Sequence, residues 1–134
     1  MQASARPVSN AALWAGRIIS GLVVVFMVFD GAIQAIAFEF VTKGMAEFHI
    51  PGEYARPLGI VTLACTALYA VPRTALLGAV LLTGYLGGAM AVQLRVGNPL
   101  FSHVLFGGYL GVALWLGLML RSTSIRALLL GRTL

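Results

Sequence analysis

Long apolar segments separated by short polar connections are the feature that most constrains this chain. A helix needs about 20 mostly apolar residues to cross a hydrocarbon core roughly 30 Å thick. Four such segments stand out, at about residues 13–38, 57–71, 74–94 and 100–120. The composition agrees, because only 10% of the 134 residues are charged, whereas soluble proteins carry roughly 25%. The sequence therefore predicts an integral membrane protein.

The second segment is the shortest of the four. It lies between Arg56-Pro57 and Pro72-Arg73, and its length corresponds to about 22 Å of helix at a rise of about 1.5 Å per residue. We expect it to borrow a turn from residues 53–56 or to lie where the bilayer is thinned.

The connections predict how the four segments are arranged. Pro72-Arg73 joins the second to the third and residues 96–99 join the third to the fourth, and connections this short make neighbouring helices antiparallel. We therefore expect one all-α domain over residues 1–134, an integral membrane four-helix bundle. The longer connection, residues 39–56, holds three of the four acidic residues, and we expect it in water or among lipid headgroups.

Charge predicts the orientation, because Lys and Arg are enriched in cytoplasmic connections. Four spans place both termini on one side, and that side carries six arginines and no acidic residue, against three basic residues and three glutamates on the other. We expect both termini in the cytoplasm and the protein in the cell membrane. The six arginines are Arg6, Arg17, Arg73, Arg121, Arg126 and Arg132.

Several functional classes are disfavoured by the sequence. The net charge of +5 is scattered without a basic run, which argues against a nucleic-acid partner. Cys65 is the single cysteine and His49 and His103 are the only histidines, so we expect no disulfide within the chain and no metal site. Nucleotide-binding and hydrolase motifs are missing, which favours a non-catalytic role for the chain on its own.

A polar cluster is predicted in the outer third of the bundle. Asp30 and Gln34 share a face of the first span, and the orientation brings Gln93, Arg95 and His103 to a similar depth. An ionisable residue within a span suggests a functional site. Two interpretations stay open: Asp30 pairs with Arg95 or His103 and locks the bundle, or the cluster binds a ligand or carries a proton.

Glycines predict where helices approach closely. Gly84 and Gly88 are spaced by four residues in the third span, and Gly107 and Gly111 in the fourth. Small residues at this spacing let helix backbones come together in membranes. We expect these two spans to pack tightly inside the chain, with a dimer seam as the alternative.

Four stretches of the sequence resemble the DoxX-like family of small bacterial four-span membrane proteins, over residues 17–126. They are Phe29-Asp30-Gly31, the run from Leu68 to Ala79, the run from Leu82 to Ala89, and Arg95-Val96-Gly97-Asn98-Pro99-Leu100-Phe101-Ser102-His103. The resemblance implies a membrane accessory or assembly factor, or a membrane subunit associated with thiosulfate:quinone oxidoreduction. Two positions depart from the pattern expected of relatives, Gln34 in place of a lysine and Gln93 in place of a histidine. Both changes remove an ionisable group.

Three functions follow as hypotheses. The first is a non-catalytic or accessory membrane module that binds an apolar ligand, a quinone or a lipid, or else a partner membrane protein or a second copy of the chain. The second is the membrane subunit of a quinone-linked oxidoreductase, with Asp30 and His103 handling protons. The third is a small proton-coupled exporter. No cofactor is evident in the sequence, and quinone is the one candidate.

Overall fold

The computed structural model describes residues 9–131, and these residues are all helical apart from short connections. The expectation of an all-α protein is confirmed. The elements in chain order are α1 (Asn10–Ile36), α2 (Glu39–Glu47), η1 (Gly52–Tyr54), α3 (Ala55–Ala70), α4 (Ala75–Arg95), η2 (Leu100–Val104), α5 (Phe106–Arg121) and α6 (Thr123–Leu129).

Three stretches are long and apolar enough to cross a membrane: α1, α4 and the continuous stretch Leu100–Arg121, which combines η2 with α5. These correspond closely to the first, third and fourth predicted segments. The second predicted segment forms α3, which has 16 residues. As expected, it gains length before Pro57, because residues 55 and 56 are helical and the short 3-10 helix η1 leads directly into them.

The ends of α1 show how the sequence sets its length. The Ser9 hydroxyl accepts a hydrogen bond from the Ala12 amide at 3.1 Å, which is the usual role of serine before a first helical turn. At the other end Ala37 adopts a left-handed conformation with φ 59°, which stops the helix. The Arg56 guanidinium then donates to the Ala35 carbonyl at 3.1 Å, so α3 begins against the end of α1.

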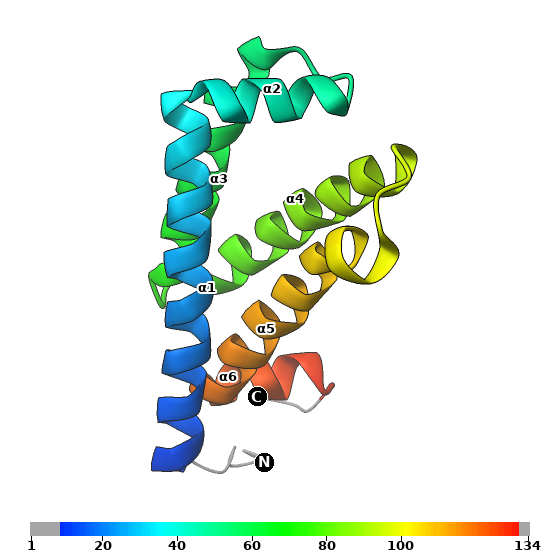
Figure 1. The fold of residues 1–134 in the computed structure, drawn as a ribbon. Helices are drawn as coiled ribbons and strands as arrows, with labels where there is room; N and C mark the ends of the chain where they lie inside the picture. Colours follow the sequence, from blue (N-terminus) through cyan, green and yellow to red (C-terminus); the bar gives the residue numbers. More distant parts are fainter. Residues whose placement is uncertain (1–8, 132–134) are drawn as a thin grey trace.

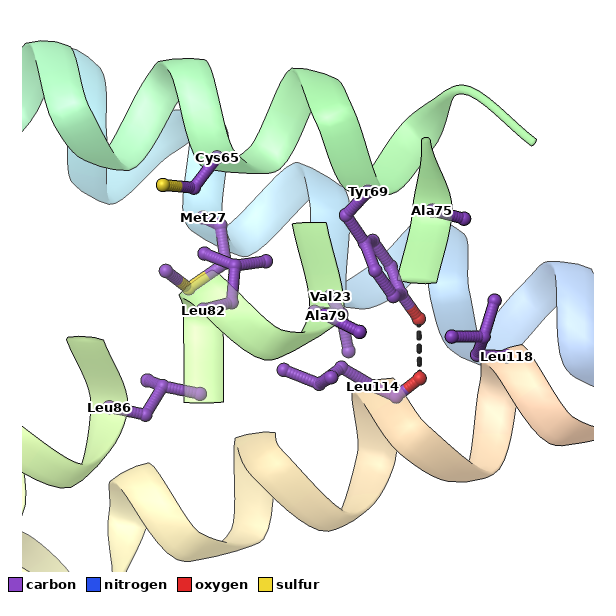
Figure 2. Packing of buried hydrophobic residues seen from close by; sticks show 10 residues of the cluster. All are labelled: Val23, Met27, Cys65, Tyr69, Ala75, Ala79, Leu82, Leu86, Leu114 and Leu118. Atoms are coloured by element: carbon purple, nitrogen blue, oxygen red, sulfur yellow. Dashed lines mark hydrogen bonds between the residues drawn. The ribbon is translucent and has the colours of Figure 1, made fainter. Parts of the chain in front are cut away.

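The long helices form two pairs that diverge (Figure 1). Helices α1 and α3 run side by side, as do α4 and α5, while α1 also contacts α5 and α3 also contacts α4. The pairs meet around a cluster of buried residues (Figure 2). In α4 the last buried residue is Leu86, and beyond it α4 slants away from α1. The cluster consists of Val23, Met27, Cys65, Tyr69, Ala75, Ala79, Leu82, Leu86, Leu114 and Leu118.

Close backbone approaches are made by glycines outside the predicted set. A Cβ on Gly16 would lie 2.8 Å from the Gly117 carbonyl oxygen, where α1 meets α5. A Cβ on Gly78 would overlap the backbone nitrogen of Tyr69, where α4 leaves α3. These two contacts fix the crossings at which the pairs are joined.

The predicted packing of glycines within the chain is corrected for three of four positions. Gly84, Gly88 and Gly111 have no atom within 4 Å of a Cβ built on them, because Gly84 and Gly88 lie on the exposed side of α4 and Gly111 faces an open groove between α4 and α5. Gly107 does pack, with a built Cβ 2.9 Å from Met90 and 3.0 Å from the Leu86 carbonyl oxygen. The alternative of a seam between two copies stays a prediction for the open positions.

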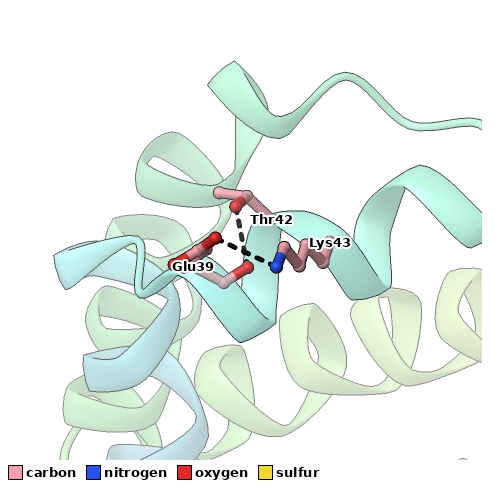
Figure 3. Close-up of polar contacts among 3 residues, drawn as sticks. All are labelled: Glu39, Thr42 and Lys43. Carbon is pink, nitrogen blue, oxygen red and sulfur yellow. Dashed lines mark hydrogen bonds and ion pairs between the residues drawn. The ribbon is translucent and has the colours of Figure 1, made fainter.

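Helix α2 lies across the end of α1, roughly perpendicular to it (Figure 1). It falls within the connection that the sequence placed in water or headgroups. Lys43 and Glu39 form an exposed ion pair at 3.0 Å, and the Thr42 hydroxyl donates to the Glu39 carbonyl (Figure 3). Met45 points inward. Phe40 of the same helix is exposed, and exposed aromatic and charged side chains on one short helix are typical of a membrane interface.

Candidate functional site

Asp30 and Gln34 form the centre of a polar cluster, as the sequence predicted. They occupy successive turns of α1, and the Gln34 amide nitrogen donates to Asp30 Oδ2 at 2.7 Å. Both side chains are partly buried. A polar group removed from water costs free energy unless it is hydrogen-bonded, and this pairing satisfies both residues.

Tyr85 of α4 completes the cluster and was missed by the sequence reasoning. Its hydroxyl lies 3.1 Å from the Gln34 amide nitrogen, from which it accepts, and 3.5 Å from Asp30 Oδ2, to which it donates. The signal was a phenol in the middle of an apolar span, because a buried tyrosine hydroxyl usually finds a partner. The cluster therefore joins α1 to α4 through neutral donors.

The other three predicted members lie elsewhere. The Gln93 side chain accepts a hydrogen bond from the Asn98 amide in the next connection, and the His103 ring nitrogen Nδ1 lies 2.8 Å from the Ser102 hydroxyl. Arg95 is exposed at the end of α4. The physical reason is the divergence of α4 and α5 from α1 beyond Leu86, which carries these ends away from Asp30.

The ion pair considered for Asp30 is not formed in the structure. Within residues 9–131 the ion pair present is Lys43 with Glu39. Asp30 instead receives both of its hydrogen bonds on Oδ2. The other carboxylate oxygen is available to a donor from outside the cluster.

A second set of polar contacts ties α1, α3 and α5 together within the core. The hydroxyl of Tyr69 in α3, fully buried, donates to the Leu114 carbonyl of α5 at 2.6 Å and lies 3.2 Å from the Ser20 hydroxyl of α1. Arg121 donates to the Tyr69 carbonyl at 3.0 Å and stacks its guanidinium over the ring, 4.9 Å from the centroid. These contacts hold α1, α3 and α5 together at the arginine-rich end of the molecule.

An apolar groove runs along the seam of α4 and α5. Its volume is about 560 Å³, within the range of about 300–1,000 Å³ that is usual for small-molecule sites. The polar side chains of its lining are Thr83 and Trp115, and they are paired with each other, because the Trp115 indole nitrogen donates to the Thr83 hydroxyl at 2.7 Å. The groove is lined by Thr83, Leu86, Gly87, Met90, Gly107, Gly108, Gly111, Val112, Trp115, Leu116 and Met119.

Comparison with known proteins settles the family. A family model described as the DoxX-like family matches residues 18–117. The chain belongs to the DoxX-like family. This confirms the resemblance drawn from the sequence and, with the apolar helices, makes the chain a small membrane protein. No curated protein and no solved structure matched it.

Metal ligands were sought among the residues that the structure of this DoxX-like chain describes. Within the described residues, no three His, Cys, Asp or Glu side chains gather as metal ligands would. The features that can act chemically are the Asp30 cluster, which can accept one more hydrogen bond, and the groove, which can take up an apolar chain.

Proposed function

We propose that this DoxX-like protein is a non-catalytic accessory module of the bacterial inner membrane that holds the apolar tail of a lipid or quinone. In this proposal α1, α3, α4 and the stretch from Leu100 to Arg121 are four spans, and both termini are cytoplasmic. The observation that carries the proposal is the apolar groove between α4 and α5. Its lining offers dispersion contacts and almost no hydrogen-bonding groups, which suits a hydrocarbon or isoprenoid chain.

The lining residues support an occupant of variable shape. Met90 and Met119 lie toward the two ends of the groove, and methionine adapts to irregular apolar partners because its side chain is unbranched and polarisable. Gly111 leaves one position of the α5 wall without a side chain and with open space above it. A tail can therefore approach the backbone of α5 directly.

Native mass spectrometry of the protein released from mild detergent tests this function. The Gly111→Leu variant fills the groove without a clash in the chain, since nothing lies within 4 Å of a Cβ there. We expect it to lose copurifying lipid or quinone that the wild type retains. Gly21→Leu is the matched control, because Gly21 is equally open but lies on α1, away from the groove. Equal retention by both variants would refute the proposal.

A partner membrane helix is the second candidate, favoured by a different surface of α4. Gly84 and Gly88 are exposed and have open space above them, and two glycines four residues apart allow close helix packing in membranes. Gly88→Leu should then abolish an association, with a second copy or another membrane protein, that Gly21→Leu leaves intact. Cross-linking in native membranes followed by electrophoresis measures this.

A further inference from the structure

We propose that Arg121 and Arg126, at the junction of α5 and α6, bind the phosphate of an anionic phospholipid whose tail lies in the α4–α5 groove. The headgroup site is argued from the arginines themselves. The position of the tail rests on the function proposed above. The inference narrows the apolar ligand of that proposal to a phospholipid with a negatively charged headgroup.

Both guanidinium groups are held in place and keep donors unused. Arg121 donates to the Tyr69 carbonyl, and Arg126 donates through Nε to the Met119 carbonyl at 3.0 Å. Within residues 9–131, Nε of Arg121 and one terminal nitrogen of Arg126 are buried without an acceptor. A guanidinium has five N–H donors in a planar fork that matches phosphate oxygens. These two donors are closed to solvent, but both side chains are only partly buried, so the remaining N–H groups of each guanidinium can donate to an anion.

The charge at this end of the molecule calls for an external counter-ion. Arg17 follows Gly16, which meets the Arg121 backbone, and Arg73 lies in the turn after α3. All four acidic side chains of the sequence lie between residues 30 and 53, in the outer part of α1, in α2 and in η1. No aspartate or glutamate is therefore near the four arginines. Basic pockets between spans, near a membrane face, recognise the headgroups of anionic lipids.

Two features point to a lipid rather than to free phosphate. Met119 lines the groove, and its carbonyl accepts the hydrogen bond from Arg126, so the groove and the arginines meet at one residue. Helix α6 and the residue after it expose Leu128, Leu129 and Leu130. Exposed leucines beside basic side chains are typical of a segment lying among headgroups with its apolar side in the acyl chains.

The test compares two lipids with the same tails. Full-length protein in mild detergent is titrated with dioleoylphosphatidylglycerol or dioleoylphosphatidylcholine, and native mass spectrometry counts the bound lipids. We expect the wild type to prefer phosphatidylglycerol, and Arg126→Gln to lower that preference about five-fold, the loss expected for one positive charge at a membrane surface. Arg126→Lys should keep most of it. Lys43→Gln removes a positive charge from α2, at the other end of the molecule, and should change nothing.

Salt provides a measurement on the unaltered protein. The preference should fall as sodium chloride is raised, because the screening length falls from about 10 Å at 0.1 M to about 3 Å at 1 M. Equal binding of the two lipids by the wild type would overturn the headgroup site but would still support binding of a lipid tail in the groove. Loss of the preference in millimolar inorganic phosphate would overturn the lipid as its source. Binding of neither lipid would overturn the groove as well.

Discussion

The functional hypotheses drawn from the sequence depended on Asp30. Its hydrogen-bond partners in the structure differ from the arginine or histidine that was considered. A carboxylate paired with an arginine would lock the helices by charge. Asp30 is instead held by an amide and a phenol, and these partners leave it able to accept a further donor. The quinone-linked subunit and the proton-coupled exporter both need Asp30 to exchange protons, and they stay hypotheses that its variants test.

Variants at the cluster separate the two interpretations of Asp30. Tyr85→Phe removes the hydroxyl that joins α4 to α1, and we expect a loss of about 1 kcal/mol, the usual contribution of one hydrogen bond. Asp30→Asn keeps an oxygen acceptor and should fold, and the double variant should cost less than the sum, because the residues are in contact. Thermal unfolding in detergent measures each. An Arg95→Gln variant that is less stable than Tyr85→Phe would instead support the ion pair.

Tyr69 should contribute more to stability than Tyr85, because Tyr69 is fully buried whereas Tyr85 is partly buried. Tyr69→Phe removes the hydrogen bond to the Leu114 carbonyl and leaves the buried Ser20 hydroxyl without its partner inside the protein, and an unsatisfied buried group costs about 1–3 kcal/mol. Tyr109→Phe is the control, since the Tyr109 hydroxyl donates to the Phe101 carbonyl at an exposed site. We expect a clear fall in melting temperature for the first variant and little change for the second. Equal effects would mean that this set of contacts is not structural.

At the scale of the helices, the sequence predicted the elements better than their contacts. The boundaries of the apolar segments were close because hydropathy and proline or arginine punctuation determine them locally. Helix α2 was missed because it is short and lies in a polar connection, which lacks the long run of apolar residues that marked the other helices. Two of the five predicted cluster residues lie together: Asp30 and Gln34 share one helix, so spacing alone joins them, whereas Gln93, Arg95 and His103 depend on the angle between helices. That angle is set by tertiary contacts such as those at Gly16 and Gly78.

Glycine substitutions test these crossings directly. Gly16→Leu would force a side chain into the backbone of α5, where a built Cβ lies 2.8 Å from both the Gly117 oxygen and the Arg121 nitrogen. We expect a loss of about 1–3 kcal/mol or more, as for overpacking in a core. Gly84→Leu points into open space and should be tolerated by the isolated chain. Thermal unfolding of both in detergent decides, and the opposite order of stabilities would show that the crossings are assigned to the wrong faces.

At the scale of the whole molecule, the charged side chains divide between its two ends. The arginine-rich end contains the close contacts of α1 with α5 and of α3 with α4, while the acidic end contains α2, the close contact of Gly59 in α3 with α1, and the diverging ends of α4 and α5 (Figure 1). The arginine-rich end is the one we place at the cytoplasmic face. A headgroup site there would lie beside the close contact of α1 with α5.

The topology follows from this division of charge and can be measured by cysteine labelling. On a Cys65→Ala background, single cysteines at Ser9, Glu47 and Ser124 are all placed at exposed positions. If α3 crosses the membrane despite its 16 residues, four spans put Ser9 and Ser124 on one side and Glu47 on the other. With the positive end in the cytoplasm, an impermeant maleimide added to intact cells should label Glu47→Cys alone, and all three should react after permeabilisation. Labelling of Ser9→Cys and Ser124→Cys from opposite sides would mean that only three helices cross, with α3 buried against α1 without spanning.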